Sequence, residues 1–255
     1  MKLNIPSDGT KIGHDGERLV VPDNPIIPYI IGDGIGIDVT PVMKRVLDYA
    51  VNKAYGNKRE IKWLELYAGS NSKELYGSIL PEETIEAMKE YRISIKGPLT
   101  TPIGKGHKSI NVQIRQKLDL FACVRPIKYF PGTSTPMAES GLTDMVVFRE
   151  NTEDLYSGIE WEPNSPGAKR IIDFINKELG HSPFRFEDNC GIGIKPVSEE
   201  GTKRLIRMAI DYSLALNKSS ITVVHKGNIM KYTEGAFRDW AYDVVTKEYL
   251  SLIHI

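Results

Sequence analysis

The chain has 255 residues, and its 33 lysines and arginines balance its 33 aspartates and glutamates. This length is enough to bury a sizeable core, as two domains or as one domain with an insertion. The balanced charge, which contains no basic block, excludes nucleic acid and anionic membrane surfaces as the main partners. No segment has the apolar core of a signal peptide or the length of a membrane span. The two cysteines, Cys123 and Cys190, indicate neither a disulfide framework nor a metal knuckle, so we expect a cytoplasmic protein.

The first third of the chain alternates between strand and helix patterns. Residues 26–31, IIPYII, form a short apolar run that predicts a buried strand. Residues 41–55 have apolar side chains at helical spacing, and this predicted helix stops at Gly56. Residues 61–69, IKWLELYAG, predict a second strand, and residues 81–91 begin with proline and acidic residues, as a helix does. This alternation is typical of an α/β domain.

The middle of the chain continues the alternation and then departs from it. Residues 93–102, ISIKGPLTTP, predict a strand that runs into a loop, and residues 110–124 predict a helix followed by a strand. From about residue 154 the pattern changes, because residues 157–196 have strand-like ends around one helix. We interpret this segment as an insertion or arm. The last segments predict a helix, a strand that ends in a loop, and another helix, in this order: residues 198–216, 219–228 and 233–250.

A glycine-rich stretch, IIGDGIGID at residues 30–38, is close to a dinucleotide-binding fingerprint. That fingerprint requires Gly-x-Gly-x-x-Gly between a strand and a helix. Here Ile37 stands in the third glycine position, so the motif fails by one residue and a glycine turn that opens a helix is the simpler interpretation. Three further motifs also fail: GKGHKS lacks the Gly-Lys-Ser of a phosphate loop, and neither His-Glu-x-x-His nor Gly-x-Ser-x-Gly occurs.

The densest group of polar candidates lies between residues 96 and 125. Ser109 stands where a helix begins, so its hydroxyl could cap the backbone, and Asn111 and Arg115 are four apart and share a helix face. Such a helix start could bind a carboxylate or a phosphate. Arg125 and Arg149 each follow a strand-like run, where α/β folds place ligand groups. The alternative is that these arginines are solvated surface groups, and spacing alone does not show that they converge.

Two residues later in the chain are candidates for proton transfer. Lys226 follows a predicted strand, and a lysine that is partly removed from water and surrounded by cations can act as a base or a nucleophile. The alternative is an ordinary surface lysine in a loop. Tyr156, in RENTEDLYSG, is either a proton donor or a packing residue whose hydroxyl is satisfied.

Four stretches together carry a family resemblance: IGDGIGIDVTPVM, GPLTTPIGKGHKSINVQIRQKLDLFACVRP, VVFRENTEDLYSGIEW and VVHKGNIMKYTEGAFRDWAY. They closely resemble the bacterial NADP-dependent isocitrate dehydrogenases of the isocitrate/isopropylmalate dehydrogenase family, from the N-terminus to about Tyr249. In this family GDGIG ends the first strand and leads into a helix of an α/β fold that is not a Rossmann fold. The resemblance therefore explains why the dinucleotide fingerprint fails.

The resemblance implies an organisation into a large domain, a small domain and a clasp. Residues 1–120 correspond to the N-terminal part of the large domain, and residues 121–153 and 199–255 to two segments of the small domain. Residues 154–198 correspond to an α+β clasp through which two subunits intertwine as a homodimer.

The resemblance also implies how isocitrate is bound. Arg115, Arg125 and Arg149 would hold its carboxylates, since guanidinium groups pair with carboxylates in a bidentate manner. Ser109 and Asn111 would add hydrogen bonds, and isopropylmalate dehydrogenases have an apolar residue in place of Ser109. In some bacteria a dedicated kinase phosphorylates this serine, and the added negative charge would repel the substrate.

The implied reaction is the oxidative decarboxylation of isocitrate to 2-oxoglutarate and CO2, with reduction of NADP. Lys226, which would reach the other subunit's site, assists removal of the hydroxyl proton as hydride leaves. A divalent metal, Mg2+ or Mn2+, polarises the resulting carbonyl, so that carbon dioxide departs and leaves an enolate. Tyr156 is then the general acid that protonates the enolate. Thr100 would touch the cofactor, and Asn228 would lie close to it.

The resemblance stops near Tyr249. The family continues with metal-binding aspartates and with the segment that grips the 2′-phosphate of NADP, so no metal ligand is assigned in this chain and the preference for NADP over NAD rests on overall similarity. The closing SLIHI is either a C-terminal strand or a sign that the chain is incomplete, and the resemblance favours the second.

We expect an incomplete large domain with exposed apolar faces and open sheet edges, and a chain that is insoluble or inactive when expressed as written. The alternatives are a non-catalytic dimerisation module or a homoisocitrate-type decarboxylating dehydrogenase.

Overall fold

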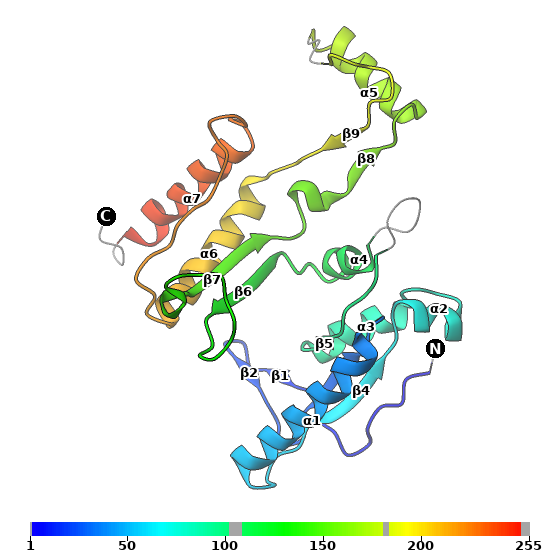
Figure 1. Ribbon diagram of the computed structural model, residues 1–255, viewed down its shortest axis with the longest axis vertical. Helices are drawn as coiled ribbons and strands as arrows, with labels where there is room; N and C mark the ends of the chain where they lie inside the picture. The colour runs from blue at the N-terminus through cyan, green and yellow to red at the C-terminus, as the bar shows by residue number, and fades with distance from the viewer. Residues whose placement is uncertain (1, 102–108, 181–183, 251–255) are drawn as a thin grey trace. The chain divides into compact units, whose positions relative to one another are not determined.

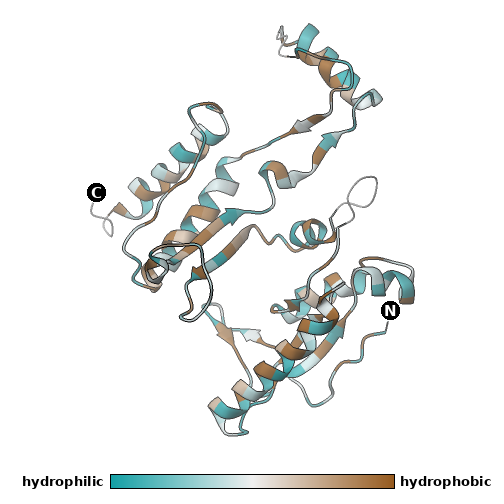
Figure 2. Ribbon diagram, in the orientation of Figure 1, coloured by the Kyte–Doolittle hydropathy of each residue, from teal (hydrophilic) through white to brown (hydrophobic). Residues whose placement is uncertain are grey.

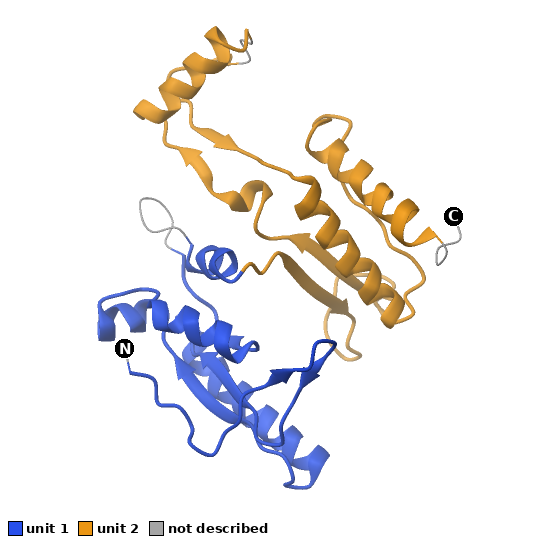
Figure 3. Ribbon diagram, turned by 180° about the vertical axis from the view of Figure 1, so that it is seen from behind, with its two compact units in different colours: residues 1–118 blue, residues 119–255 orange. Residues whose placement is uncertain are grey.

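The computed structural model describes residues 2–101, 109–180 and 184–250, and the chain divides into two compact units (Figures 1 and 3). Unit 1 comprises Met1–Leu118 and unit 2 comprises Asp119–Ile255. The closing residues 251–255, SLIHI, lie outside the described residues. The roles assigned above to the large domain, the small domain and the clasp stay predictions.

Unit 1 is built on a three-stranded parallel sheet. Strand β3 (Ile26–Ile30) is central and pairs with β4 (Lys62–Leu66) on one side and β5 (Ile95–Lys96) on the other. All five residues of β3 are buried, which is typical of a parallel strand that is covered on both faces. The three predicted strands are therefore confirmed, although β5 is shorter than its apolar run suggests. An antiparallel pair, β1 (Gly13–His14) and β2 (Leu19–Val20), was not predicted.

The first helix of unit 1 is longer than predicted. Helix α1 spans Gly36–Tyr55, so it begins five residues before Pro41 and carries this proline in its second turn. The proline removes one hydrogen bond from the helix interior without ending the helix. The predicted stop is confirmed, because Gly56 adopts a left-handed conformation with φ 56° at the C-terminal cap.

Three further helices pack around the sheet of unit 1. Helix α3 (Glu82–Tyr91) and helix α4 (Ile110–Lys117) were predicted, whereas the short α2 (Ser70–Tyr76) was not. One core joins the sheet to α3 and α4, and its largest fully buried side chains include the following: Ile30, Leu64, Leu66, Ile85 and Tyr91.

Helix α1 also exposes an apolar stripe. Val39, Val42, Val46 and Tyr49 recur at helical spacing and are 47%, 55%, 60% and 69% exposed, and Figure 2 shows hydrophobic residues along this helix. The expected exposed apolar face is thus present in unit 1. Within the described residues, β4 and β5 are the edge strands of the sheet.

The backbone crosses itself very closely where β3 and β5 end. A Cβ atom on Gly97 would lie 1.9 Å from the carbonyl oxygen of Ile31, and a Cβ on Gly32 would lie 2.3 Å from that of Pro98. Gly32 also has φ 91°, which favours glycine. Gly32 of the failed fingerprint therefore allows close chain packing at the end of the sheet, and Gly36 is the first residue of α1, in line with the predicted glycine turn that opens a helix.

Unit 2 contains a two-stranded antiparallel ribbon of β6 (Ala122–Lys128) and β7 (Asp144–Glu150). A short 3-10 turn, η1 (Ser140–Leu142), precedes β7, and a second one, η2 (Asp154–Ser157), follows it.

The structure confirms that the predicted arm of unit 2 contains a strand, a helix and a second strand in this order. Strands β8 (Ile159–Trp161) and β9 (Ile192–Ile194) pair in an antiparallel manner, and helix α5 (Pro166–Lys177) lies between them in sequence. In Figure 1, α5 lies beyond the β8–β9 pair, at the end of this arm.

One predicted strand of unit 2 is wrong. Residues 219–226 have no strand assignment, although the sequence predicts a strand that ends in a loop over residues 219–228. A strand requires a hydrogen-bonded neighbour, and no strand in the described part of the chain pairs with this segment. Ile221 and Val224 are accordingly 45% and 83% exposed.

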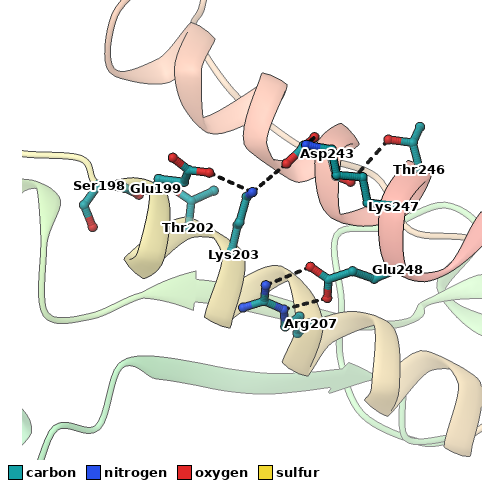
Figure 4. Close-up of polar contacts among 9 residues, drawn as sticks. All are labelled: Ser198, Glu199, Thr202, Lys203, Arg207, Asp243, Thr246, Lys247 and Glu248. Carbon is teal, nitrogen blue, oxygen red and sulfur yellow. Dashed lines mark hydrogen bonds and ion pairs between the residues drawn. The ribbon is translucent and has the colours of Figure 1, made fainter.

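The two long helices of unit 2 pack against each other. Helix α6 (Glu199–Ala215) and helix α7 (Glu234–Glu248) share a small core of Ile206, Ile210, Ala241 and Val244. Ion pairs flank this core (Figure 4), where Lys203 contacts Glu199 at 2.7 Å and Asp243 at 2.5 Å. Arg207 donates two parallel hydrogen bonds of 2.7 Å to Glu248, which is the bidentate geometry of a strong pair.

These ion pairs predict that acid weakens the contact between α6 and α7. Lys203 and then Lys247 lower the pKa of Asp243, and Arg207 lowers the pKa of Glu248. A carboxyl with a lowered folded-state pKa stabilises the fold above its unfolded pKa, and that stabilisation disappears as the pH falls through the folded-state pKa. The double variant Asp243→Asn/Glu248→Gln should therefore lose less stability on acidification than the original chain. Urea midpoints at neutral and acidic pH measure this, with the exposed Glu160→Gln as control. A pH dependence as steep in the double variant as in the original would contradict the prediction.

Candidate active site

Arg149 and Tyr156 form the centre of the candidate site in unit 2. Arg149 lies at the end of β7, and its Nη1 donates a hydrogen bond to the hydroxyl of Tyr156 in η2. The guanidinium carbon lies 4.2 Å from the centroid of the tyrosine ring. Asn151, which is only 3% exposed, accepts a bond of 3.3 Å from Nη2 of Arg149 and donates one of 3.2 Å to the carbonyl of Leu120. A buried amide thus fixes the arginine, and the arginine holds the tyrosine hydroxyl.

The strand register places the two predicted arginines of unit 2 on one face. Cys123 pairs directly with Arg149, and Arg125 pairs with Val147. Directly opposed residues point to the same side of an antiparallel ribbon, and so do residues two apart on one strand. Arg125 and Arg149 are therefore diagonal neighbours on the same face. Arg125 is exposed, and its Nε donates to the sulfur of Cys123 at 3.2 Å.

A cavity of about 210 Å³ in unit 2 is lined by Arg149 and Tyr156 together with carboxylate side chains. The carboxylates that line it are Glu150, Glu153, Asp154 and Glu234. Sequence reasoning missed all four, although the run RENTEDLY concentrates three of them next to the two predicted residues.

Two of these carboxylates stabilise the local fold. Glu153 accepts hydrogen bonds from the backbone N–H of Ser198 at 2.9 Å and from its hydroxyl at 2.6 Å, and so anchors the start of α6. Glu150 accepts from the backbone N–H and the hydroxyl of Thr152, each at 2.7 Å. One oxygen of Glu150, Oε2, is buried and has no hydrogen-bond partner among the described residues.

The remaining two carboxylates contact Lys195. Its Nζ lies 3.2 Å from Oδ1 of Asp154 and also pairs with Oε1 of Glu234. Burial alone would lower the pKa of Lys195, but the hydrogen bonds to Glu234 and Asp154 raise it overall. The pKa of Glu234 is lowered, first by Lys195 and then by the backbone N–H of Lys226, which donates to Oε2 at 3.0 Å.

Lys226 and Asn228 lie in the loop between α6 and α7 and are both exposed. The predicted role of Lys226 as a base or a nucleophile assumes a side chain that is partly removed from water. The single chain does not provide that environment, because Lys226 is exposed. The role that the resemblance implies for Lys226 concerns a second subunit and stays a prediction.

Unit 1 holds the other predicted residues. Ser109 is at the N-terminal cap of α4, but its hydroxyl makes no capping bond and instead lies 3.1 Å from the hydroxyl of Thr101. The predicted cap is therefore wrong. Asn111 donates a bond of 3.4 Å to the carbonyl of Leu99, and Arg115 is half-buried on α4.

The difference between two cap positions predicts unequal effects of serine replacement. Ser198 accepts a hydrogen bond of 3.0 Å from the backbone N–H of Gly201 and caps α6, whereas Ser109 does not cap α4. Ser198→Ala should lower the free energy of unfolding by about 1 kcal/mol. Ser109→Ala should lower it by less than about 0.5 kcal/mol. Urea denaturation of both variants tests this, and equal losses would contradict the structure.

A lysine that sequence reasoning did not single out lies at the end of β5. Lys96 donates to the carbonyl of Gly97 at 2.7 Å, and the residue as a whole remains exposed. Partial burial of its ammonium group, followed by the charge of Arg115, lowers its pKa, against the opposing effect of Asp33. Lys96 therefore adds a second cationic group to the Arg115 region of unit 1.

Asp33 organises the loop that carries Thr100. Its two carboxylate oxygens accept hydrogen bonds of 2.9 Å from the backbone N–H groups of Ser70 and Thr100, and its own N–H donates to the carbonyl of Pro98 at 2.6 Å. The acidic residue of GDGIG thus joins the end of β3 to the loop after β5. Thr100 is exposed there.

Two negative findings concern the described residues alone. In residues 2–101, 109–180 and 184–250, no group of three or more histidine, cysteine, aspartate or glutamate side chains could hold a metal ion. None of the helices in these ranges combines the length and apolar character needed to cross a membrane.

Comparison with known proteins now defines the class. The family model for isocitrate/isopropylmalate dehydrogenase matches residues 26–254, and the chain belongs to this family. Among its relatives, isocitrate dehydrogenase [NADP] 1 of Colwellia maris is 56% identical over 99% of this chain. Isocitrate dehydrogenase [NADP] of Pseudomonas aeruginosa is 53% identical over 97%. The chain spans 62% and 60% of the length of these two relatives.

Solved structures agree on the fold. The crystal structure of isocitrate dehydrogenase from Methylococcus capsulatus is similar with a TM-score of 0.70 and 34% identity, over 88% of this chain and 57% of that chain. The TT0538 protein from Thermus thermophilus is similar with a TM-score of 0.67 and 31% identity, over 97% of this chain and 43% of that chain. The α/β fold of this dehydrogenase family, expected from the sequence, is confirmed.

Proposed function

We propose that this chain belongs to an NADP-dependent isocitrate dehydrogenase, which converts isocitrate and NADP to 2-oxoglutarate, CO2 and NADPH. The observation that carries the proposal is the Arg149–Tyr156 pair, in which a guanidinium group holds a phenolic hydroxyl inside a cavity. A carboxylate bound by the arginine would lie beside a proton donor. Relatives with the name isocitrate dehydrogenase [NADP] support this assignment at 52–56% identity.

In the proposed reaction the residues of this chain bind substrate and move protons. Arg125 and Arg149 bind carboxylates of isocitrate from one face of the β6–β7 ribbon. Arg115 binds a further carboxylate, and Ser109 and Asn111 donate hydrogen bonds. Substrate contacts of this kind orient the reacting groups, which removes much of the entropic cost of the reaction.

Proton transfer is assigned to two residues. Lys226 takes the proton of the substrate hydroxyl as the C2 hydride departs. Tyr156 donates a proton to the enolate carbon after the β-carboxylate has left as CO2. Arg149 holds the phenolic oxygen in place, and water then returns the proton to it.

Residues of this chain fit a part of a dinucleotide site, whereas no described group of residues fits a metal site. NADP, when bound, accepts the hydride, and the exposed side chains of Thr100 and Asn228 would donate or accept hydrogen bonds to it. These two residues fit a part of such a site. Mg2+ or Mn2+ stays a prediction from the resemblance, and no step above depends on it, because the described residues offer no cluster of ligands for a metal.

The proposed partners are a second copy of the chain and a regulatory kinase with its phosphatase. The arm of residues 154–198 would intertwine with that of another subunit, and Lys226 would then act in the partner's site. Phosphorylation of Ser109 would place negative charge at the start of α4, where a substrate carboxylate is expected to bind, and would block binding by repulsion. The cytoplasm stays the expected location.

The test uses a fusion, because the relatives are longer than this chain. Residues 1–249 are joined to the C-terminal part of the Colwellia maris relative that follows the position aligned with Tyr249, and NADPH formation is measured with isocitrate and Mg2+. We expect turnover of isocitrate and little turnover of homoisocitrate or isopropylmalate. Preference for homoisocitrate would establish the alternative dehydrogenase, and a folded fusion dimer without turnover would favour the non-catalytic dimerisation module.

A further inference from the structure

A three-residue charge bridge connects the segment that carries Tyr156 with the segment that carries Lys226. Lys195 lies directly after β9 and contacts both Asp154, two residues before Tyr156, and Glu234, in the first turn of α7. Glu234 gives its other oxygen to the backbone N–H of Lys226, at 3.0 Å. The side chains of Asp154, Lys195 and Glu234 are 32%, 23% and 18% exposed, so water screens these contacts only in part.

The backbone near Asp154 shows that this end of the bridge holds a constrained turn. Asp154 has φ 59°, in the left-handed region that residues other than glycine rarely adopt. Its backbone N–H donates to the carbonyl of Pro196 at 2.9 Å, and its side chain accepts from the N–H of Leu155 at 2.6 Å. The chain after β9 therefore contacts this turn through both Lys195 and Pro196. A conformation of this kind persists only where its surroundings determine it.

The Lys226 end is also packed closely. A Cβ atom on Gly227 would lie 2.8 Å from the Cα of Gly235, so the loop approaches the start of α7 at the limit of backbone contact. Asp154, Glu234 and Tyr156 all line the cavity of about 210 Å³ that contains Arg149. Asp154 and Glu234 thus line the same cavity, and Lys195 provides the charge between these two carboxylates, which would otherwise repel each other.

We propose that Asp154, Lys195 and Glu234 form a positioning bridge that holds the Tyr156 turn and the Lys226 loop in one fixed relation. This proposal rests on the proposed function in one respect, namely that Tyr156 and Lys226 transfer protons. Asp154, Lys195 and Glu234 are proposed to touch neither substrate nor cofactor. They act through the two residues whose backbones they hold.

Hydrogen–deuterium exchange tests the bridge without reference to catalysis, in the 255-residue chain and in the fusion. Lys195→Met should speed exchange of the Lys226 and Tyr156 amides about fivefold, the factor that one net hydrogen bond implies. Glu234→Gln keeps an acceptor for the Lys226 N–H but loses the charge that anchors Lys195, so it should speed exchange at the Tyr156 amide. Lys62→Met, in unit 1, removes a lysine that also bridges two carboxylates, Asp8 and Glu60, and should change neither amide.

Kinetics of the fusion separate positioning from general stability. Lys195→Met should lower kcat while KM for isocitrate stays within about twofold, since the substrate-binding arginines are unchanged. Lys195→Arg, which keeps the charge, should restore most of kcat. Unchanged amide exchange in Lys195→Met, or an equal change in Lys62→Met, would overturn the bridge. A fusion without any turnover would instead overturn the proposed function, and the exchange data would still decide whether the bridge exists.

Discussion

Replacement of Tyr156 by phenylalanine should lower kcat of the isocitrate-oxidising fusion by roughly a hundredfold to ten-thousandfold, the usual contribution of a positioned general acid. The variant removes only the hydroxyl that accepts a hydrogen bond from Arg149, and it keeps the ring that lies 4.2 Å from the guanidinium carbon. KM for isocitrate should change little, because Arg149 retains its contact with Asn151. Initial rates of NADPH formation over a range of isocitrate concentrations give both constants.

The matched control is Tyr212→Phe. Tyr212 lies in α6, and its ring packs edge-on against Phe148 at 5.3 Å between centroids. This variant also removes one tyrosine hydroxyl from unit 2, but not one that contacts Arg149. A loss of kcat in Tyr212→Phe as large as that in Tyr156→Phe would show that the effect is structural, and the role of general acid would then be withdrawn.

The second large effect is expected at Gly97, where alanine should destabilise unit 1 by about 1–3 kcal/mol or more. The added Cβ would lie 1.9 Å from the carbonyl oxygen of Ile31, and neither group is the end of a flexible side chain. The end of β5 would have to move away from β3, which also displaces the loop that Asp33 holds through Thr100. Urea denaturation reports this through the fluorescence of Trp63, the tryptophan of unit 1, when Trp161 and Trp240 are replaced by phenylalanine.

Gly13→Ala is the control for this prediction. Gly13 lies in β1 of unit 1, and a Cβ atom there would lie 3.7 Å from the Cβ of Val20, which is ordinary van der Waals contact. We expect its unfolding free energy to stay within about 0.5 kcal/mol of the original. A Gly97→Ala variant as stable as Gly13→Ala would mean that the two strand ends can separate without cost.

The elements that the sequence predicted correctly are those whose side chains carry a local pattern. The buried run of β3, the acidic start of α3 and the glycine stop of α1 each depend on residues that are neighbours in the chain. The segment at 219–226 has an equally clear pattern, but a strand depends on a partner as well, and pattern alone does not provide one. Short α2 carries too few residues for a reliable period.

The candidate site likewise contains some residues that the sequence could predict and others that it could not. Arg149 could be singled out from its place after a strand-like run and Tyr156 from its residue type as a proton donor, and the structure brings them into contact. The contributions of Lys195 and Glu234 could not be predicted, because they are 39 residues apart and α6 with the loop after it lies between them in the chain. Ser109 shows the opposite case, since its position at the cap was predicted correctly but its hydroxyl turns to Thr101.

The ion pairs between α6 and α7 make this helix pair sensitive to the kind of salt and not only to its amount. Chloride screens the pairs Arg207–Glu248 and Lys203–Asp243, whose partly exposed side chains place them within reach of mobile ions. Sulfate screens them too but also strengthens apolar burial, which favours the small core of Ile206, Ile210, Ala241 and Val244. High sodium chloride should therefore loosen α7 before the rest of unit 2, whereas ammonium sulfate should keep it docked, and this difference guides the choice of buffer for purifying and storing the protein.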